Sequence, residues 1–384
     1  MVMARTKRLS LAGPAPGAAE TGGILTIDLA AIAANWQTLA RQLIAMECAA
    51  VVKANAYGLG LKPVVIALAR AGCKTFFVAD LAEARTVRAS ARQATIYVLH
   101  GFTLDAADAF IEFGARPVIN SMTELAEWDT FIAAHGWQGG AALHVDTGMH
   151  RLGVSPAEAA ALAPRVHTAN HGIALLLSHL ACAELPDHPL TAIQLKMFRE
   201  LRTLYAGIPA SLANSSGIFL GDTAHFDLAR PGAALYGINP TPGRPNPMKS
   251  VVELAGRILQ IRSIGRDQTI GYGAAWTARR NSRVAVVALG YADGLLRAGG
   301  GSDERTGGSG IVAGKKCPIV GRISMDLLAL DITDLPDGAA RRGDLATLIG
   351  GELSIDDVAA AAGTIGYEVL TRLGPRCHLT YRSA

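Results

Sequence analysis

Lys53 is the residue best placed for covalent chemistry, within the stretch VVKANAYGLG at residues 51–60. It ends an apolar run, residues 48–53, that is typical of a buried strand, so its amine is expected to face a pocket that excludes water. Desolvation disfavours the ammonium form and lowers its pKa, which lets the neutral amine form a Schiff base with a carbonyl compound. Because a solvated lysine at a strand end is the commoner arrangement, this interpretation needs support from the rest of the chain.

Other polar residues follow similar apolar runs further along the chain. They are Asp80, His100, Asn120, Asp146, His179, Asn214, Ser215 and Arg230. In a closed parallel barrel all strands end at one rim, and that rim carries the active site. Polar residues end strands in many folds, but lysine, histidine and arginine together at these positions indicate one shared site.

The elements that must position these residues form a repeating β/α pattern between residues 24 and 245. Asp28 is suited to cap the first helix, and Ser121 with Glu124 has the pattern of a capping box. Eight apolar runs read as strands: residues 48–53, 75–79, 95–99, 116–119, 141–146, 173–179, 210–214 and 226–229. Eight such units predict an N-terminal (β/α)8 TIM barrel of the α/β class.

A second domain is expected after a Pro- and Gly-rich linker at residues 240–247. Strand patterns dominate residues 246–384, and residues 354–362 form the one clear helical pattern there, so we predict a mostly-β C-terminal domain. The expected strands are residues 251–264, 283–289, 311–323, 327–333 and 344–349. Residues 299–310 lack a strand-to-helix context and predict a mobile loop, not a phosphate cradle. Residues 1–23 predict a disordered N-terminal extension.

Composition excludes several other classes of protein. The formal net charge of +4 over 384 residues, without a block of like charges, argues against nucleic-acid binding. No apolar run approaches the roughly 20 residues that span a bilayer. The five scattered cysteines lack CxxC spacing and favour a reducing, cytoplasmic location. No metal site is expected, because His167 and His171 have helical spacing but no third ligand.

Nine segments in order resemble motifs of the alanine racemases, a family of enzymes that use pyridoxal phosphate. They are residues 51–60, 146–153, 178–181, 213–216, 229–237, 271–273, 290–294, 321–326 and 366–368. Each motif is weak by itself, but nine in register are specific. The resemblance runs from about Leu25 to Tyr381, so it covers nearly everything but the N-terminal extension.

The resemblance implies that Lys53 holds pyridoxal phosphate as a Schiff base and carries protons on one face of the substrate. Tyr272, from the C-terminal domain, would serve the other face, so that L-alanine and D-alanine interconvert and D-alanine supplies bacterial peptidoglycan. A free phenol has a pKa near 10, too high for an efficient base at neutral pH. The family's network for lowering it matches His179 and Arg230. Arg230 would also face the pyridine nitrogen and leave it unprotonated, which weakens the cofactor as an electron sink.

The same resemblance implies the remaining contacts. The cofactor phosphate would be held by Tyr57, Asn214, Ser215, the backbone of Gly232 and Ala233, and Tyr367. Arg151 and Met325 would contact the substrate carboxylate, and Tyr291 would act as a gate in the substrate channel. A homodimer with shared active sites is implied, each site combining Lys53 of one chain with Tyr272 of the other.

Three positions depart from the family pattern. His144 stands where many members have a lysine, often carbamylated, that holds the arginine matching Arg151. Histidine cannot form that carbamate, so another anion or His144 itself must orient Arg151. Leu59 replaces a frequent histidine and Ser324 a frequent cysteine, and neither change removes an expected acid–base group.

Three alternative functions fit parts of the pattern. A racemase of the same family that prefers serine, or accepts many amino acids, shares these motifs. A pyridoxal-phosphate decarboxylase of the same architecture would offer a carboxylate to the pyridine nitrogen, and Arg230 argues against it. A non-catalytic protein that binds pyridoxal phosphate would resemble a single barrel, and the second domain with Tyr272 argues against that.

Overall fold

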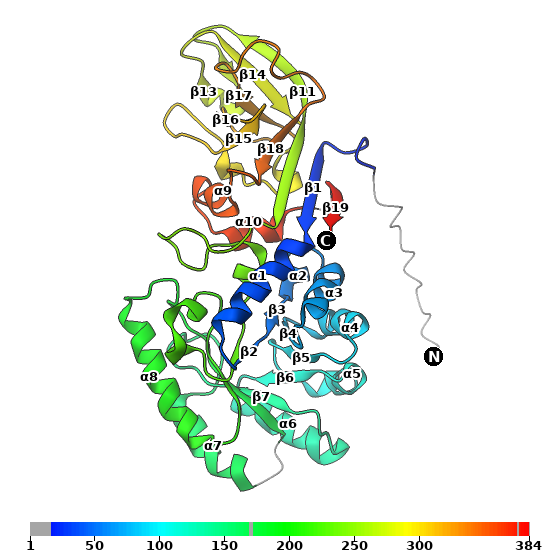
Figure 1. Ribbon diagram of the computed structural model, residues 1–384, viewed down its shortest axis with the longest axis vertical. Helices are drawn as coiled ribbons and strands as arrows, with labels where there is room; N and C mark the ends of the chain where they lie inside the picture. The colour runs from blue at the N-terminus through cyan, green and yellow to red at the C-terminus, as the bar shows by residue number, and fades with distance from the viewer. Residues whose placement is uncertain (1–16, 169–171, 375, 384) are drawn as a thin grey trace, which may run out of the picture.

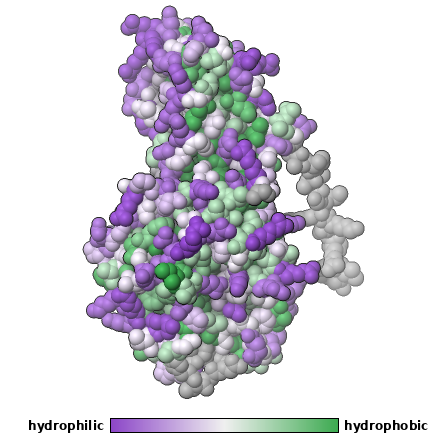
Figure 2. Space-filling model, in the orientation of Figure 1, coloured by the Kyte–Doolittle hydropathy of each residue, from purple (hydrophilic) through white to green (hydrophobic). Residues whose placement is uncertain are grey.

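The computed structural model describes residues 17–168, 172–374 and 376–383. Figure 1 shows a helix-rich lower body and a strand-rich upper body along the long axis of the molecule. On the face drawn in Figure 2, hydrophilic and apolar side chains are interspersed over both bodies. No helix among the described residues is long and apolar enough to cross a membrane.

The lower body is built on a seven-stranded parallel sheet in which each strand pairs with the next along the chain. Its strands are β3 (Ala50–Val51), β4 (Thr75–Val78), β5 (Thr95–Val98), β6 (Arg116–Ile119), β7 (Ala141–His144), β8 (Ile173–Leu177) and β9 (Ala210–Ser211). An eighth strand, β10 (Leu228–Ala229), pairs in parallel with β2 (Glu47–Cys48). The N–H of Arg230 also donates to the carbonyl of Ala213 at 2.8 Å, which joins the segment after β10 to the segment after β9.

These contacts close the ring and confirm the predicted (β/α)8 barrel. The first predicted strand is present as two halves, β2 and β3, on either side of Ala49. The N–H of Ala49 donates to the carbonyl of Ala229 at 3.0 Å, so the interruption keeps its hydrogen bond to the eighth strand.

Helices surround this barrel, as Figure 1 shows. They are α1 (Leu29–Gln42), α3 (Leu61–Ala71), α4 (Leu81–Ser90), α5 (Ala107–Phe113), α6 (Met122–His135), α7 (Pro156–Thr168) and α8 (Pro189–Leu204). Both N-cap residues are confirmed: the Asp28 carboxylate accepts from the N–H of Ala31 at 2.7 Å, and the Ser121 hydroxyl accepts from the N–H of Glu124 at 3.1 Å. The second half of the predicted capping box is absent, because the Glu124 carboxylate accepts from the N–H of Asn120 at 2.7 Å and not from that of Ser121. These side chains satisfy N–H groups that have no partner inside the helix.

The upper body is mostly strand, as predicted, and centres on the long strand β11 (Val252–Ile264), which pairs antiparallel with β1, β14 and β18. Its other strands are β12 (Thr269–Ile270), β13 (Trp276–Thr277), β14 (Ser282–Val287), β15 (Ser309–Val312), β16 (Lys315–Pro318), β17 (Leu328–Asp331), β18 (Leu345–Ile349) and β19 (His378–Arg382). Residues 311–323, expected as one strand, instead include the second half of β15 and all of β16, which pair as a hairpin that begins at Ser309. Its turn lies at Ala313 and Gly314, both with positive φ, which a continuous strand does not contain.

Two further features of the upper body differ from the sequence-based expectation. Strand β1 (Gly23–Asp28) lies mostly in the range expected for the barrel, but it pairs with β11 and β19 of the upper body. Helix α9 (Ile355–Ala361) begins after Ser354 as predicted, and a second helix, α10 (Gly366–Arg372), follows it. With only two turns, α10 shows little periodicity in the sequence.

Candidate active site

Lys53 lies at the carboxyl end of β3, where it begins a short turn, α2 (Lys53–Tyr57). This turn is left-handed, with φ of 54–56° from Ala54 through Tyr57. Burial lowers the pKa of the Lys53 amine, and the charge of Arg151 lowers it further, while Glu83 acts in the opposite direction. A larger share of the amine is therefore neutral, and able to form an imine, than for a lysine in water.

Arg230 follows β10 and is buried, at 5% exposure. Its Nη2 donates to the carbonyl of Ser178 at 2.5 Å and its Nη1 donates to the hydroxyl of Ser211. Its guanidinium also lies over the ring of Phe77, 5.8 Å from the centroid. Burial lowers the pKa of Arg230 to about 10, so the group stays charged at neutral pH and presents a permanent cation inside the barrel.

His179 follows β8 at the same rim. Burial lowers its pKa well below 6.5, and the charges of Arg230 and Arg151 add to the effect, so the imidazole is neutral at pH 7. Gln194 of α8 holds the backbone that follows this residue. Its Nε2 donates to the His179 carbonyl at 2.9 Å, and its Oε1 accepts from the N–H of Ala181 at 2.9 Å.

Arg151 lies in the loop that follows β7 and is exposed. The loop is shaped by Asp146, whose carboxylate accepts from the N–H groups of Gly148, Met149 and His150 at 2.9–3.1 Å. These bonds lower the pKa of Asp146, although burial opposes them. The charge of Arg151 lowers the pKa values of Lys53, His144 and His179.

His144 ends β7 and has a defined tautomer. Its Nδ1 lies 2.8 Å from Oδ1 of Asn120, and Nδ2 of Asn120 donates to the carbonyls of Val118 and Leu99 at 2.8 and 3.3 Å. Because the amide nitrogen faces two acceptors, Oδ1 must accept and Nδ1 of His144 must carry the proton. Burial lowers the pKa of His144 to about 4, and Arg230 contributes, so the free Nε2 is a neutral acceptor.

A cradle for an anionic group lies between the segments that follow β9 and β10. The Ser215 hydroxyl accepts from the N–H groups of Gly232 and Ala234 at 3.0 and 3.1 Å, and its own proton remains available to a ligand. A Cβ on Gly232 would lie 2.3 Å from the Tyr57 hydroxyl, so this position has room only for glycine. Asn214 shapes the same turn by accepting from the N–H of Gly217 at 2.9 Å.

Three aromatic rings border this cradle. Tyr57 stacks on Tyr236 with ring centroids 4.5 Å apart, and Tyr367 of α10 lies 6.0 Å from Tyr57. Burial raises the pKa values of Tyr57 and Tyr367, so both hydroxyls stay protonated and can donate. The hydroxyls of Ser215, Tyr57 and Tyr367 are donors of the kind that bind a phosphate, and the buried Arg230 is a charged donor of the kind that can face an aromatic ring nitrogen.

The C-terminal domain presents the other site residues to solvent. Tyr272 begins the turn η5 (Tyr272–Ala274) and is 72% exposed, and Met325 is 53% exposed. Tyr291 begins η6 (Tyr291–Asp293), and its N–H donates to the Ser324 carbonyl at 3.0 Å. Among the described residues, no hydrogen bond or ion pair joins the Tyr272 side chain to Lys53.

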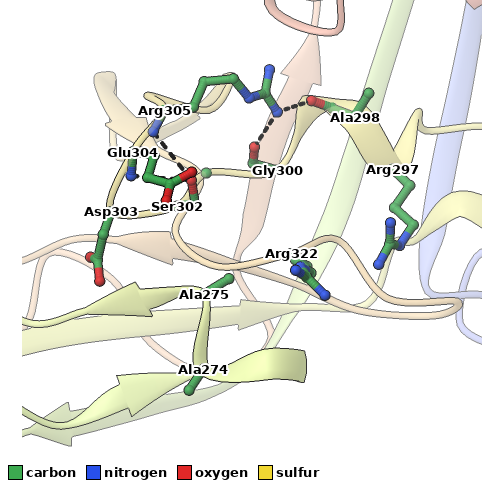
Figure 3. Close-up of a pocket in the computed structure, with 11 residues that line it drawn as sticks. Ala274, Ala275, Arg297, Ala298, Gly300, Ser302, Asp303, Glu304, Arg305 and Arg322 are labelled. Carbon is green, nitrogen blue, oxygen red and sulfur yellow. Dashed lines mark hydrogen bonds between the residues drawn. The ribbon is translucent and has the colours of Figure 1, made fainter.

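A cavity of 450 Å³ in the C-terminal domain, lined in part by Ala274 and Ala275, was not anticipated from the sequence. Figure 3 shows it between Ala274 and Ala275 on one side and Arg297, Arg305 and Arg322 on the other. Arg305 is held by the carbonyls of Gly300 and Ala361 at 2.6 and 3.0 Å and also donates to Ala298. The cavity is lined by three arginines and by the carboxylates of Asp303 and Glu304, so charges of both signs face it.

Comparison with known proteins extends over both domains. Residues 27–240 match the family model described as "Alanine racemase, N-terminal domain" and residues 251–381 match "Alanine racemase, C-terminal domain". An alanine racemase of Methylobacterium sp. is 51% identical over 94% of this chain and 98% of its own length, and that of Rhodospirillum rubrum is 47% identical over 92% and 94%.

Solved structures agree with the sequence comparison. The structure of an alanine racemase from Bartonella henselae with covalently bound pyridoxal phosphate has a TM-score of 0.88 at 39% identity, over 94% of this chain and 99% of that one. The biosynthetic alanine racemase of Pseudomonas aeruginosa has a TM-score of 0.87 at 36% identity, over 94% of this chain and 100% of that one.

Proposed function

Because the chain belongs to the alanine racemase family, we propose that it is a pyridoxal-phosphate enzyme that interconverts L-alanine and D-alanine. The observation that carries the proposal is Lys53, whose amine has a lowered pKa at the barrel rim that also holds Arg230 and His179. D-alanine from this reaction would supply peptidoglycan synthesis.

The residues at the rim fit pyridoxal phosphate. Lys53 would hold its aldehyde carbon, and Arg230 would face its pyridine nitrogen as a group that keeps its own proton. The phosphate would be held by Ser215, Asn214 and the cradle at Gly232 and Ala233, with Tyr57 and Tyr367 donating from the side. When bound, the cofactor delocalises the electrons that remain on the substrate Cα after its proton leaves.

Racemisation requires a proton to leave one face of Cα and another to arrive at the opposite face. The Lys53 amine would carry a proton on one face, since burial and Arg151 bring its pKa down from its ordinary value. The Tyr272 phenol would serve the other face. Arg151 and the backbone of Met325 would hold the substrate carboxylate, and Tyr291 would border its entry.

We place Lys53 and Tyr272 of one site on two copies of the chain. Support for this comes from the exposure of Tyr272 and Met325, 72% and 53% in the single chain, and from the buried state of the barrel residues they would complement. A second copy laid over the barrel rim would remove both side chains from water. We also place the enzyme in the cytoplasm, because all five cysteines are unpaired thiols.

The test begins with borohydride treatment of the purified protein, which should attach pyridoxal phosphate to the peptide that contains Lys53, as seen by mass spectrometry. An assay that resolves the enantiomers should then show faster racemisation of alanine than of serine and larger amino acids. Lys53→Ala is the control and should lose both properties. Attachment of pyridoxal phosphate at another lysine would contradict the proposed role of Lys53. Equal rates with alanine and serine would contradict the proposed substrate.

A further inference from the structure

We propose that Glu83, on helix α4, is a positioning residue for Lys53: its carboxylate ties the left-handed turn after Lys53 to the end of strand β4. This role rests on the proposed function of Lys53. Glu83 takes no part in the acid–base steps and belongs to none of the nine motifs.

The turn needs external support because of its backbone conformation. Ala54, Asn55, Ala56 and Tyr57 are four successive non-glycine residues with φ between 54 and 56°. The left-handed helical region is unfavourable for an L-residue, because its Cβ approaches the following carbonyl oxygen. Such a turn persists only where surrounding contacts over-determine it.

Glu83 uses the two oxygens of its carboxylate to contact this turn and the end of β4. Its Oε1 accepts from the N–H of Asn55 at 2.8 Å, and its Oε2 accepts from the N–H of Ala79, just after β4, at 2.9 Å. Hydrogen bonds to an ionised carboxylate are stronger than those between neutral groups. The carboxylate therefore bridges the backbone of the Lys53 turn and the backbone of the neighbouring strand end.

Further hydrogen bonds fix both ends of this bridge. At one end, Asn55 is bonded to the start of helix α3: its Oδ1 accepts from the N–H of Leu61 at 2.8 Å, and its carbonyl accepts from the N–H of Gly60 at 2.9 Å. Glu83 is the third residue of α4, and its own N–H donates to the capping carboxylate of Asp80 at 3.0 Å. The hydrogen bonds thus run from a helix start through Glu83 and across the turn to a second helix start.

The carboxylate also acts on the Lys53 amine through its charge. Glu83 raises the pKa of that amine, against the lowering by burial and by Arg151. Removal of the negative charge should therefore lower the pH at which the amine loses its proton. Shortening the side chain with the charge kept should loosen the turn with less effect on that pH.

Glu158 provides a matched control within the chain. It is the third residue of α7, and its carboxylate accepts from the N–H and the hydroxyl of Ser155 at 2.7 and 2.8 Å. It therefore caps only its own helix. A Glu158→Gln variant makes the same chemical change in the same helical position, away from Lys53.

The experiment compares Glu83→Gln, Glu83→Asp and Glu158→Gln in the full-length chain. Hydrogen exchange at the Asn55 amide should be at least tenfold faster in both Glu83 variants and unchanged in Glu158→Gln. The pH midpoint for incorporation of pyridoxal phosphate at Lys53 should move to lower pH in Glu83→Gln, and less in Glu83→Asp. Circular dichroism should confirm that all three variants are folded.

Unchanged hydrogen exchange at the Asn55 amide in both folded Glu83 variants would overturn the proposed positioning role. An unchanged pH midpoint for cofactor incorporation in Glu83→Gln would overturn the proposed effect of the Glu83 charge on Lys53. Hydrogen exchange is measured without cofactor, so it reports on the hydrogen bond between Glu83 and Asn55 even if pyridoxal phosphate does not attach to Lys53. Absence of attachment in the parent chain would instead contradict the proposed function.

Discussion

The barrel rim and the loops of the C-terminal domain contribute to the proposed site in opposite ways. Arg230 is 5% exposed and Ser215 4%, and both are fixed by hydrogen bonds, whereas Tyr272 is 72% exposed and Met325 53%. In the chain without ligand, burial already shifts the pKa values of His144, His179 and Arg230, and Asn120 already fixes the tautomer of His144. The exposed groups acquire a low-dielectric environment only when another surface covers them. This difference is the one expected if, as proposed, each site combines the barrel rim of one chain with the Tyr272 loop of another.

The largest expected effect tests this division directly. Lys53→Ala and Tyr272→Phe should each reduce activity by about a hundredfold or more, since a positioned acid–base group contributes about 10²–10⁴ in rate. Mixed under conditions that exchange subunits, the two inactive variants should recover about a quarter of parental activity, because half of the dimers are then mixed and each has one intact site.

Mixing either variant with itself is the control and should recover nothing. Recovery that fails despite proven subunit exchange would place Lys53 and Tyr272 of one site on the same chain, and the comparison between the two regions would lose its basis.

A smaller effect concerns how well water is excluded from the barrel rim around His144. His144 has a pKa of about 4 in the folded chain against about 6.5 when unfolded, so between these values the unfolded state binds an extra proton. Stability contributed by neutral His144 is complete above pH 6.5 and is lost as pH falls toward 4, by about 2–3 kcal/mol at pH 4.5. Urea unfolding of the parent and of His144→Gln at pH 7 and 4.5 measures this difference.

The His144→Gln variant should lose less stability on acidification than the parent, since it has no imidazole to protonate. If both proteins lose the same free energy of unfolding between pH 7 and pH 4.5, His144 titrates as it does in water. The barrel rim would then be more accessible to water than its burial indicates.

The smallest effect concerns the preformed cradle. Ser215→Ala removes the acceptor of two N–H bonds and one donor to the phosphate, so the Kd for pyridoxal phosphate should rise about tenfold, equivalent to about 1.4 kcal/mol. Titration of the cofactor-free protein measures this constant. Buried Ser216 beside it is the matched control, and Ser216→Ala should leave the Kd within about twofold. A similar change in both variants would mean that the segment is merely destabilised.

Much of the fold was predictable because its signals are local. The apolar runs marked the barrel strands, and Asp28, Ser121 and Ser354 marked helix starts through bonds to N–H groups three residues away. Helix α10 was missed although α9 has the same length, because Ser354 signals the start of α9 whereas Ile365, before α10, makes no side-chain cap. The candidate site residues came largely from motif resemblance, since a lone lysine or tyrosine carries no spacing signal of its own.

By itself, the sequence determined which residue types end the strands, where the helices are capped and which family the motifs resemble, because these depend on neighbours along the chain. Tertiary structure decided that β1 joins the upper sheet, that Asn120 sets the tautomer of His144, and that Tyr381 donates to the Leu59 carbonyl at 3.1 Å beside the Lys53 turn. Those contacts join residues from 24 to 322 positions apart, and their hydrogen bonds form only after folding brings the partners within reach.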